Sequence, residues 1–231
     1  MTAPATAGRT IDAEEPTRYA WLARIFGRCL AGYVWLVGHT ARFSGGPINQ
    51  EPVIYAIWHE SNLVGAITAY RLVRNRRAVS FSTRGFRGIV MNTMLRSFGA
   101  RVVTLPGEGR STRTEAAAMA REMAALGRSG HMLVVSCDGP FGPYRVAKPG
   151  VLIVARESGL PIRPWAIASR PPFRLNNRWD RMIVALPFGR MRVFEGPPLA
   201  VGERDRIKPR LAELQAALDE IQARADHAAG S

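Results

Sequence analysis

The chain has 231 residues, 47% of them apolar, and a formal net charge of +14 at pH 7. Its length and composition favour one sizeable hydrophobic core and are somewhat small for two ordinary domains. Nearly all of the positive charge comes from arginine, because only Lys148 and Lys208 are lysines. Such a surface attracts anions such as phospholipid headgroups, nucleotide-bearing cofactors and nucleic acid, although arginine richness also follows from genomic base composition.

The two cysteines and the N-terminus indicate a reducing, cytoplasmic setting. Cys29 and Cys137 lie far apart and form no C-x-x-C spacing, which excludes a disulfide framework. Residues 1–15 are small, polar and acidic, unlike a secretory signal. We expect them to form a disordered tail.

Residues 16–44 predict an amphipathic helix that associates with a membrane. Arg24 and Arg28 fall on one side of a helical wheel, with Trp21 and Trp35 close to them, as expected of indole rings at a headgroup boundary. A contiguous apolar arc contains Leu22, Ile25, Phe26, Cys29, Leu30, Tyr33, Leu36 and Val37. Two arginines near the centre of a membrane span would cost several kcal/mol, so we expect an interfacial helix. The alternative is a helix packed on the core of its own domain.

Residues 45–225 alternate between short apolar runs and helical segments, which predicts one α/β domain. We expect a mostly parallel mixed sheet of about seven strands flanked by helices. The predicted strands are Val53–Trp58, Ala78–Ser82, Arg101–Leu105, Met132–Ser136, Ile162–Ala168, Met182–Leu186 and Met191–Phe194. The predicted helices cover roughly 61–74, 87–98, 111–127 and 149–158.

The C-terminal part predicts a hairpin and a helix. The last two apolar runs are separated only by the short turn PFGR, which indicates an antiparallel hairpin at one edge of the sheet. After Asp205 and Pro209, leucine and isoleucine recur at helical spacing and predict a helix that packs on the sheet. We expect residues 226–231 to be disordered.

Three loops follow predicted strands, where ligands gather in open α/β sheets. In the first loop, IWHESNLV, His59 ends an apolar run and is a candidate general base. The second loop, LPGEGRSTRT, brings Arg110 and Arg113 to the start of a helix that Ser111 or Thr112 can cap. This pattern predicts a phosphate site; a simple helix cap with solvated arginines is the alternative.

The third loop, SCDGPFGPYRVAKPG, places Asp138 at a strand end. Two Gly-Pro steps make the loop rigid, and Arg145 and Lys148 follow closely, which indicates a shaped anion site. A turn that uses the same residues for shape alone is the alternative. We expect Cys137 to be a core residue rather than a nucleophile, since no histidine is near it in sequence.

In this order, the three loops resemble the lysophospholipid acyltransferase-like superfamily, which includes the glycerolphosphate acyltransferases. The nearest pattern is that of a bacterial branch known as a domain of unknown function and marked by D-G-P-x-G-P. The resemblance extends from about Thr40 to Leu199. It includes AIWHESNL, GEGRST, DGPFGPYRVAKPGVLIVARESGLPIRPW and RWDRMIVALPFGRMRVFEGPPL, in which Asp180 is also consistent with a turn or a salt bridge.

The resemblance implies an O-acyltransferase that needs no metal or bound cofactor. Its histidine acts as general base on the hydroxyl of an acyl acceptor, which attacks acyl-CoA or acyl carrier protein directly. His59 carries over as the base. The implied ligands of the acceptor's phosphate or polar head are Gly109, Arg110 and Ser111, and the residues that shape the site are Gly139, Pro140, Gly142, Pro143 and Arg145.

The acid of the superfamily's H-x-x-x-x-D pattern is missing, because Val64 stands at its position. That acid holds the imidazole in its productive tautomer. Two carboxylates are candidates to replace it: Glu60, which is adjacent to His59, and Asp138, which follows another predicted strand. We favour Asp138, either as the residue that orients His59 or as an acid that fixes the loop. A base without a carboxylate partner is the third possibility.

The sequence therefore predicts a peripheral or monotopic enzyme at the cytoplasmic face of the inner membrane. It would acylate a lysophospholipid or related lipid, with membrane lipids and the acyl donor as its partners. The alternative is a non-catalytic lipid- or anion-binding protein that keeps the fold. We do not expect nucleic-acid binding, because no aromatic stacking strand accompanies the charge. The sequence leaves the oligomeric state open.

Overall fold

The structure is a computed structural model that describes residues 18–45, 51–72, 78–82, 84–104, 113–139 and 141–230. The expected tail at residues 1–15 lies outside this part of the chain. The helices are α1 Ala20–Thr40, the 3₁₀ helix η1 His59–Ser61, α2 Asn62–Leu72, α3 Gly85–Arg96, α4 Arg113–Arg128, α5 Gly150–Ser158 and α6 Ile207–Gly230. The strands are β1 Arg42–Ser44, β2 Ile54–Ile57, β3 Ala78–Ser82, β4 Arg101–Thr104, β5 Met132–Ser136, β6 Ile162–Arg170, β7 Phe173–Arg174, β8 Ile183–Val184 and β9 Arg190–Glu195.

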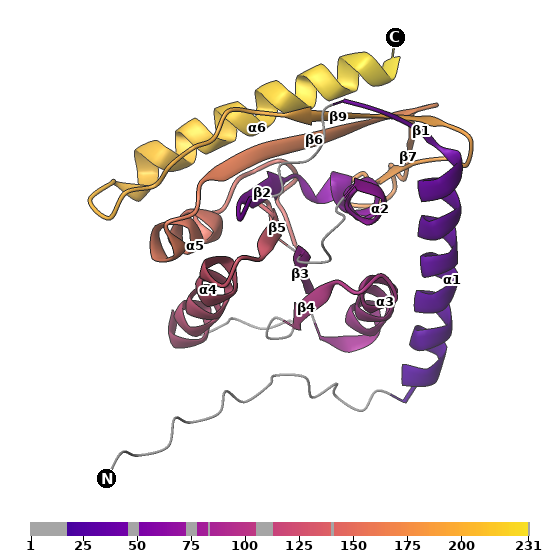
Figure 1. Ribbon diagram of the computed structural model, residues 1–231, viewed down its shortest axis with the longest axis horizontal. Coiled ribbons are helices and arrows are strands. Elements are labelled where there is room, and N and C mark those ends of the chain that lie inside the picture. The colour runs from indigo at the N-terminus through magenta and orange to yellow at the C-terminus, as the bar shows by residue number, and fades with distance from the viewer. Residues whose placement is uncertain are drawn as a thin grey trace.

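The main sheet has seven strands in the order β1-β9-β6-β2-β5-β3-β4. All neighbouring strands are parallel except β6 and β9, which are antiparallel. This arrangement confirms the predicted α/β class and the mostly parallel mixed sheet. Figure 1 shows α6 lying along β6 and β9, while the other helices flank the remaining strands.

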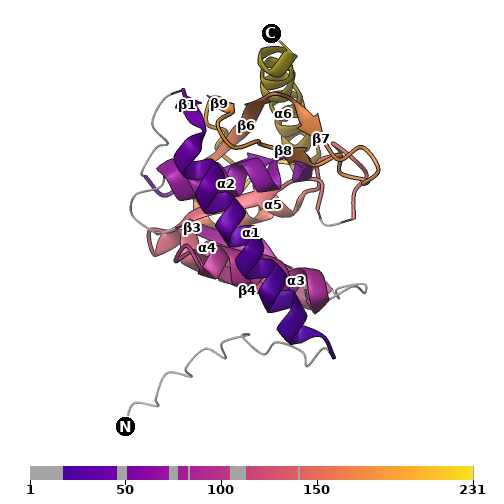
Figure 2. The same cartoon turned by 90° about the vertical axis from the view of Figure 1, so that its right-hand side faces the viewer.

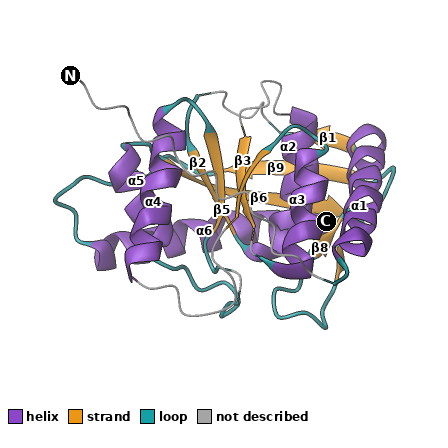
Figure 3. Ribbon diagram, turned by 90° about the horizontal axis from the view of Figure 1, so that it is seen from below, coloured by secondary structure: helices purple, strands orange, loops and turns teal. Residues whose placement is uncertain are grey.

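Helices cover both faces of the sheet, and the alternation of side chains along β2 explains why. Tyr55 and Ile57 point into an apolar cluster with α1, α2 and α3. Ile54 and Ala56 point into the opposite cluster with α4, α5 and α6. A strand that is buried on both faces must be apolar throughout, as β2 is. Figure 3 shows the two groups of helices on either side of the strands.

The predicted hairpin between the last two apolar runs is wrong. β9 pairs with β6 on one side and with β1 on the other, so no edge of β9 is left for β8. β8 instead pairs with β7 in a separate two-stranded sheet. The seventh strand of the main sheet is therefore β1, which is too short and polar to be recognised in the sequence.

The C-terminal helix is longer than expected. α6 continues to Gly230, so the prediction that residues 226–231 are disordered is wrong for all but Ser231, which lies outside the described residues. Ile221 and Ala225 are buried against β6 and β9. This packing continues the helix beyond the segment that the leucine spacing indicated.

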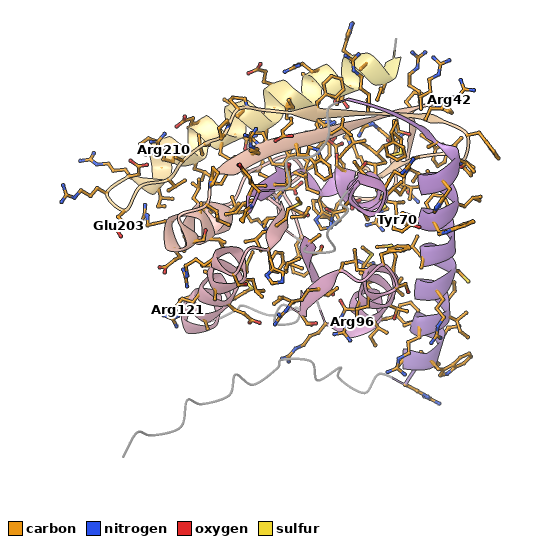
Figure 4. All side chains as sticks on the ribbon, in the orientation of Figure 1. Arg42, Tyr70, Arg96, Arg121, Glu203 and Arg210 are labelled. Carbon is orange, nitrogen blue, oxygen red and sulfur yellow. The ribbon has the colours of Figure 1, made fainter. Side chains whose placement is uncertain are left out.

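The N-terminal helix α1 packs on the domain through its small residues. Its buried side includes Ala23, Gly27 and Ala31, and Figure 2 shows α1 crossing the face of the molecule that carries α3. A further contact is made by Tyr70, which points from α2 towards α1 in Figure 4 and meets Gly38. The large apolar side chains Trp21 and Phe26 remain exposed. The helix therefore has a packed face and a separate exposed apolar face.

Gly27 is expected to be essential for the contact between α1 and α3. A Cβ atom at this position would lie 2.5 Å from Cβ of Thr93 and 2.8 Å from the backbone oxygen of Val90. We expect Gly27→Ala to lower the free energy of unfolding by about 1 to 3 kcal/mol in urea denaturation, because the helices must separate. Gly32→Ala in the same helix is the control: nothing lies within 4 Å there, so the added helix propensity should stabilise. Equal stability of the two variants would contradict the close contact.

Four arginines show how positive charge is distributed over the molecule. Figure 4 labels Arg42, Arg96, Arg121 and Arg210, which lie at the periphery on β1, α3, α4 and α6. The first three are exposed and the last is half-buried. These four charges therefore occupy different sides of the molecule rather than one patch.

Candidate active site

His59 and Asp138 come together because their strands are neighbours. β2 and β5 pair in parallel up to Ile57 and Ser136, and the backbone N–H of Cys137 donates to the carbonyl of Ile57 at 2.8 Å. The carboxyl ends of both strands therefore lie side by side. His59 leaves β2 in the turn of η1, and Asp138 leaves β5 two residues beyond its last strand residue.

Asp138 binds the backbone of the loop that contains His59 and of its own loop. Its Oδ1 accepts a hydrogen bond from the backbone N–H of His59 at 2.9 Å, and its Oδ2 accepts one from the backbone N–H of Arg145 at 3.3 Å. Asp138 is fully buried, and burial raises its pKa to about 6, although these N–H donors act in the opposite direction. These contacts suit an acid that fixes the loop. Asp138 binds the backbone N–H of His59 and not its imidazole.

The imidazole of His59 packs against the ring of Trp179, and both residues line a cavity. The two ring centres are 5.1 Å apart. Nδ1 of His59 is buried, and it has no hydrogen-bond partner within the part of the chain that the structure describes. Burial lowers the pKa of His59 to about 4, opposed by the negative charge of Asp180 and assisted by Arg178 and Lys148. His59 is therefore neutral at physiological pH, as a general base must be.

Glu60, the other candidate partner, points away from the imidazole into a charged network. Its buried carboxylate accepts hydrogen bonds from the hydroxyl of Tyr144 at 2.7 Å, from Nε of Arg145 at 2.8 Å and from Nη1 of Arg174. Both arginines also bind Asp226 of α6, at 2.8 and 2.6 Å. Two carboxylates and two guanidinium groups thus form a neutral network that ties α6 to η1.

Asp180 is the carboxylate whose charge acts most on the imidazole. It is fully buried in the loop before β8, next to Trp179. Arg178 donates to it from Nε at 2.8 Å and from Nη2 at 2.9 Å. Burial tends to raise the pKa of Asp180, but its bonds to Arg178 lower it below the usual value. For this residue the sequence offered the motif RWDRM and, as the other reading, a turn or a salt bridge. The salt bridge is present, with Arg178, whereas the place of Asp180 beside His59 depends on the folding of the loop.

Val64 cannot supply the missing acid and lies in a fully apolar setting. It is completely buried in the cluster that joins α1, α2 and α3 to the sheet. The position of the usual acid is therefore part of the core in this chain. Among the described residues, no group of three or more His, Cys, Asp or Glu side chains is placed to hold a metal ion.

A large cavity opens next to His59, where the sheet splits. β3 pairs with β5 only at its first two residues, so the ends of the two strands diverge. The space has a volume of about 1500 Å³ and is lined by His59 and Asn62 together with many apolar side chains of α1, α2, α3 and α4. Ordinary ligand pockets measure about 300 to 1,000 Å³, so this cavity has room for two substrates or for one long chain.

The structure describes some of the predicted binding residues and not others. Gly139 and Gly142 have positive φ, and their backbones lie against Lys148 and Trp179 at the cavity. Arg145 belongs to the Glu60 network, and Pro143 follows Gly142 in the same loop. The predicted residues Gly109, Arg110, Ser111 and Pro140 lie outside the described residues. Cys137 is buried and burial raises the pKa of its thiol, which fits the core residue that we expected.

The pKa shifts of His59 and Asp138 predict opposite effects of pH on stability. The pKa of His59 falls from 6.5 to about 4 on folding, so its contribution is complete above pH 6.5 and is lost as the pH falls towards 4. The pKa of Asp138 rises from 3.8 to about 6, so its contribution is complete below pH 3.8 and is lost as the pH rises through 6. The two effects partly cancel in the natural chain.

The variant His59→Gln separates the two effects, since it keeps the backbone N–H that binds Asp138. The natural chain should lose about 2 kcal/mol of stability from this group between pH 7 and pH 5, and the variant should lose none, because it has no imidazole to protonate. Urea denaturation of both proteins at the two pH values measures this difference. A constant difference would contradict the low pKa of His59.

Comparisons with known proteins give limited similarity. No protein-family model matches the chain. An uncharacterized protein of Rickettsia prowazekii (strain Madrid E) is 26% identical over 164 residues, which make up 71% of each chain. The crystal structure of the 1-acyl-sn-glycerophosphate (LPA) acyltransferase PlsC from Thermotoga maritima has a TM-score of 0.49 and 16% identity, and the match covers 87% of this chain and 78% of that one. Neither likeness assigns an activity to this chain, so its function is inferred from the site.

Proposed function

We propose that this protein is an O-acyltransferase that moves a fatty acyl chain from acyl-CoA or acyl carrier protein to the hydroxyl of a lysophospholipid or related lipid. The observation that carries the proposal is the imidazole of His59 in the lining of a large apolar cavity. A buried base is suited to take a proton from a hydroxyl, and the apolar walls are suited to an acyl chain.

The basic side chains near His59 support an anionic substrate. Lys148 and Arg178 line the same cavity, and Lys148 lies against the backbone of Gly139. The residues Arg110 and Ser111 remain proposed ligands of the acceptor's polar head, with Gly109 beside them. Because Arg178 is already paired with Asp180, the ammonium group of Lys148 is the charge that would compensate a phosphate or a nucleotide-bearing donor in the cavity.

An acyl-transfer assay tests the proposal directly. The full chain is incubated with labelled palmitoyl-CoA or palmitoyl-acyl carrier protein and with lysophosphatidic acid, lysophosphatidylglycerol or lysophosphatidylethanolamine. We expect a labelled diacyl product and release of one free thiol for each ester formed. A chain that binds lysolipids in the same mixtures but forms no ester is instead the non-catalytic lipid-binding protein. The buried Nδ1 of His59, which has no described partner, favours that alternative.

The exposed face of α1 supports docking on a membrane, and we propose that this is the cytoplasmic surface. Ala20–Thr40 is long and apolar enough to cross a membrane by length and composition, and it is the one such helix among the described residues. Its exposed side chains include Trp21, Ile25, Phe26 and Trp35. Aromatic and aliphatic side chains beside arginines suit the interface of an anionic leaflet.

Substitutions on the exposed face of α1 test this docking. Deletion of residues 1–43 would also remove Val34 and Val37 from the core, so point substitutions are preferable. We expect the triple variant with Trp21, Ile25 and Phe26 changed to serine to float much less with vesicles of phosphatidylglycerol and phosphatidylethanolamine. Phe173→Ser, which removes an exposed ring elsewhere, is the control. Unchanged flotation of the triple variant would contradict docking through α1.

A further inference from the structure

Asn62 shares one side of a tight turn with His59. The 3₁₀ helix η1 begins at His59, and the backbone N–H of Asn62 donates to the carbonyl of His59. Residues three apart lie directly above one another in a 3₁₀ helix. Both side chains line the same cavity. A molecule that reaches the imidazole therefore also reaches the amide of Asn62.

A hydrogen bond from the neighbouring strand fixes the orientation of this amide. The hydroxyl of Ser136, the last residue of β5, donates to Oδ1 of Asn62 at 2.6 Å. With Oδ1 held by β5, Nδ2 is the amide atom left for a bound molecule. Nδ2 donates no hydrogen bond to any residue that the structure describes. Asn62 thus presents a positioned and uncommitted donor to the cavity.

Several other donors around His59 are already engaged. Arg178 uses Nε and Nη2 on Asp180, and the backbone N–H groups of Cys137, Gly139 and Lys148 donate to backbone carbonyls. The ammonium group of Lys148 lies against Gly139 on the loop after β5. Ser61 lies on the same turn, but it is buried and does not line the cavity, whereas Asn62 is a neutral side-chain donor that does.

We propose that Asn62 is a catalytic residue whose Nδ2 stabilises the oxyanion formed at the thioester carbonyl, and that Ser136 positions it. This inference rests on the proposed acyl transfer. In the reaction, His59 takes the proton of the acceptor hydroxyl while the hydroxyl oxygen attacks the carbonyl carbon of the thioester. The carbonyl electron pair moves to oxygen, which accepts the hydrogen bond from Asn62. When the carbonyl reforms, the C–S bond breaks and the thiolate receives the proton from His59, so the products are one ester and one thiol.

Three variants of the full chain test the role of Asn62. Asn62→Ala should lower kcat by about 100- to 1,000-fold with little change in KM, because the donor acts mainly on the transition state. Asn62→Asp keeps the shape and the bond from Ser136 but replaces the donor by a carboxylate, so we expect a loss at least as large. Ser136→Ala should lower kcat less than either, because the amide loses its orientation but not its donor.

The double variant separates positioning from structural damage. Adding Ser136→Ala to Asn62→Ala should cause no further loss of kcat, because the hydroxyl acts through the amide. A kcat near that of the natural chain in Asn62→Asp, with the same melting temperature, would overturn the inference while the acyltransferase proposal stands. A natural chain that forms no ester with any donor and acceptor overturns the proposed function, and this inference with it.

Discussion

Replacing His59 by alanine is expected to lower the rate of acyl transfer by about 100- to 10,000-fold. The substitution removes the proposed base, and among the described residues no other histidine lines the cavity. Because Asp138 binds the backbone N–H of His59 rather than its ring, the loop contact survives the substitution. Steady-state rates with the donor and acceptor that give product measure the effect.

His131→Ala is the matched control for this substitution. His131 lies just before β5 and binds Ser129 and the carbonyl of Leu126, outside the cavity lining. We expect it to retain the activity of the natural chain. Full activity of His59→Ala, with a melting temperature close to that of the control, would rule out His59 as the base and require another residue in this role.

Replacing Glu60 by glutamine is expected to lower the free energy of unfolding by about 3 to 5 kcal/mol. The carboxylate is fully buried and accepts bonds from Arg145, Arg174 and Tyr144. Glutamine has nearly the same shape, but it removes the negative charge and points an N–H₂ group at positively charged donors. Two guanidinium groups would then share the single carboxylate of Asp226. Urea denaturation at pH 7 measures the loss.

Glu213→Gln provides the control for the effect of burial. Glu213 is exposed, and its partner Arg210 binds it at 2.7 Å. Exposed ion pairs contribute about 0 to 1 kcal/mol, so this variant should be nearly as stable as the natural chain. A loss in Glu60→Gln no larger than in the control would show that the network contributes little to stability. Because Glu60 is adjacent to His59, we also expect its substitution to reduce acyl transfer.

Local sequence patterns were sufficient for most of the fold. The limits of β3 and β5 match the predicted runs Ala78–Ser82 and Met132–Ser136 residue for residue. Apolar runs bounded by polar or glycine residues define such buried strands without reference to the rest of the chain. The same reasoning failed for β8 and β9, because a short turn favours a hairpin only when the strands have free edges.

The interpretation of α1 shows a second limit. The apolar arc read from the sequence is divided in the structure, since Val37 is buried while Ile25 and Phe26 are exposed. The small residue Gly27 lies close to α3 instead, and Ala23 is buried as well. A hydrophobicity pattern does not record that close packing between helices favours small side chains over large ones.

By itself, the sequence determined the α/β class, most element limits, the position of His59 after a strand and the absence of an acid at Val64. Only the tertiary structure decided which carboxylates face the histidine. Asp138 reaches its backbone across 79 residues of chain, Glu60 turns towards Arg145 and Arg174, and Asp180 brings its charge to the ring from another loop. The physical reason is that periodicity is a local property, whereas the direction of a buried charge depends on strand order and on partners distant in sequence.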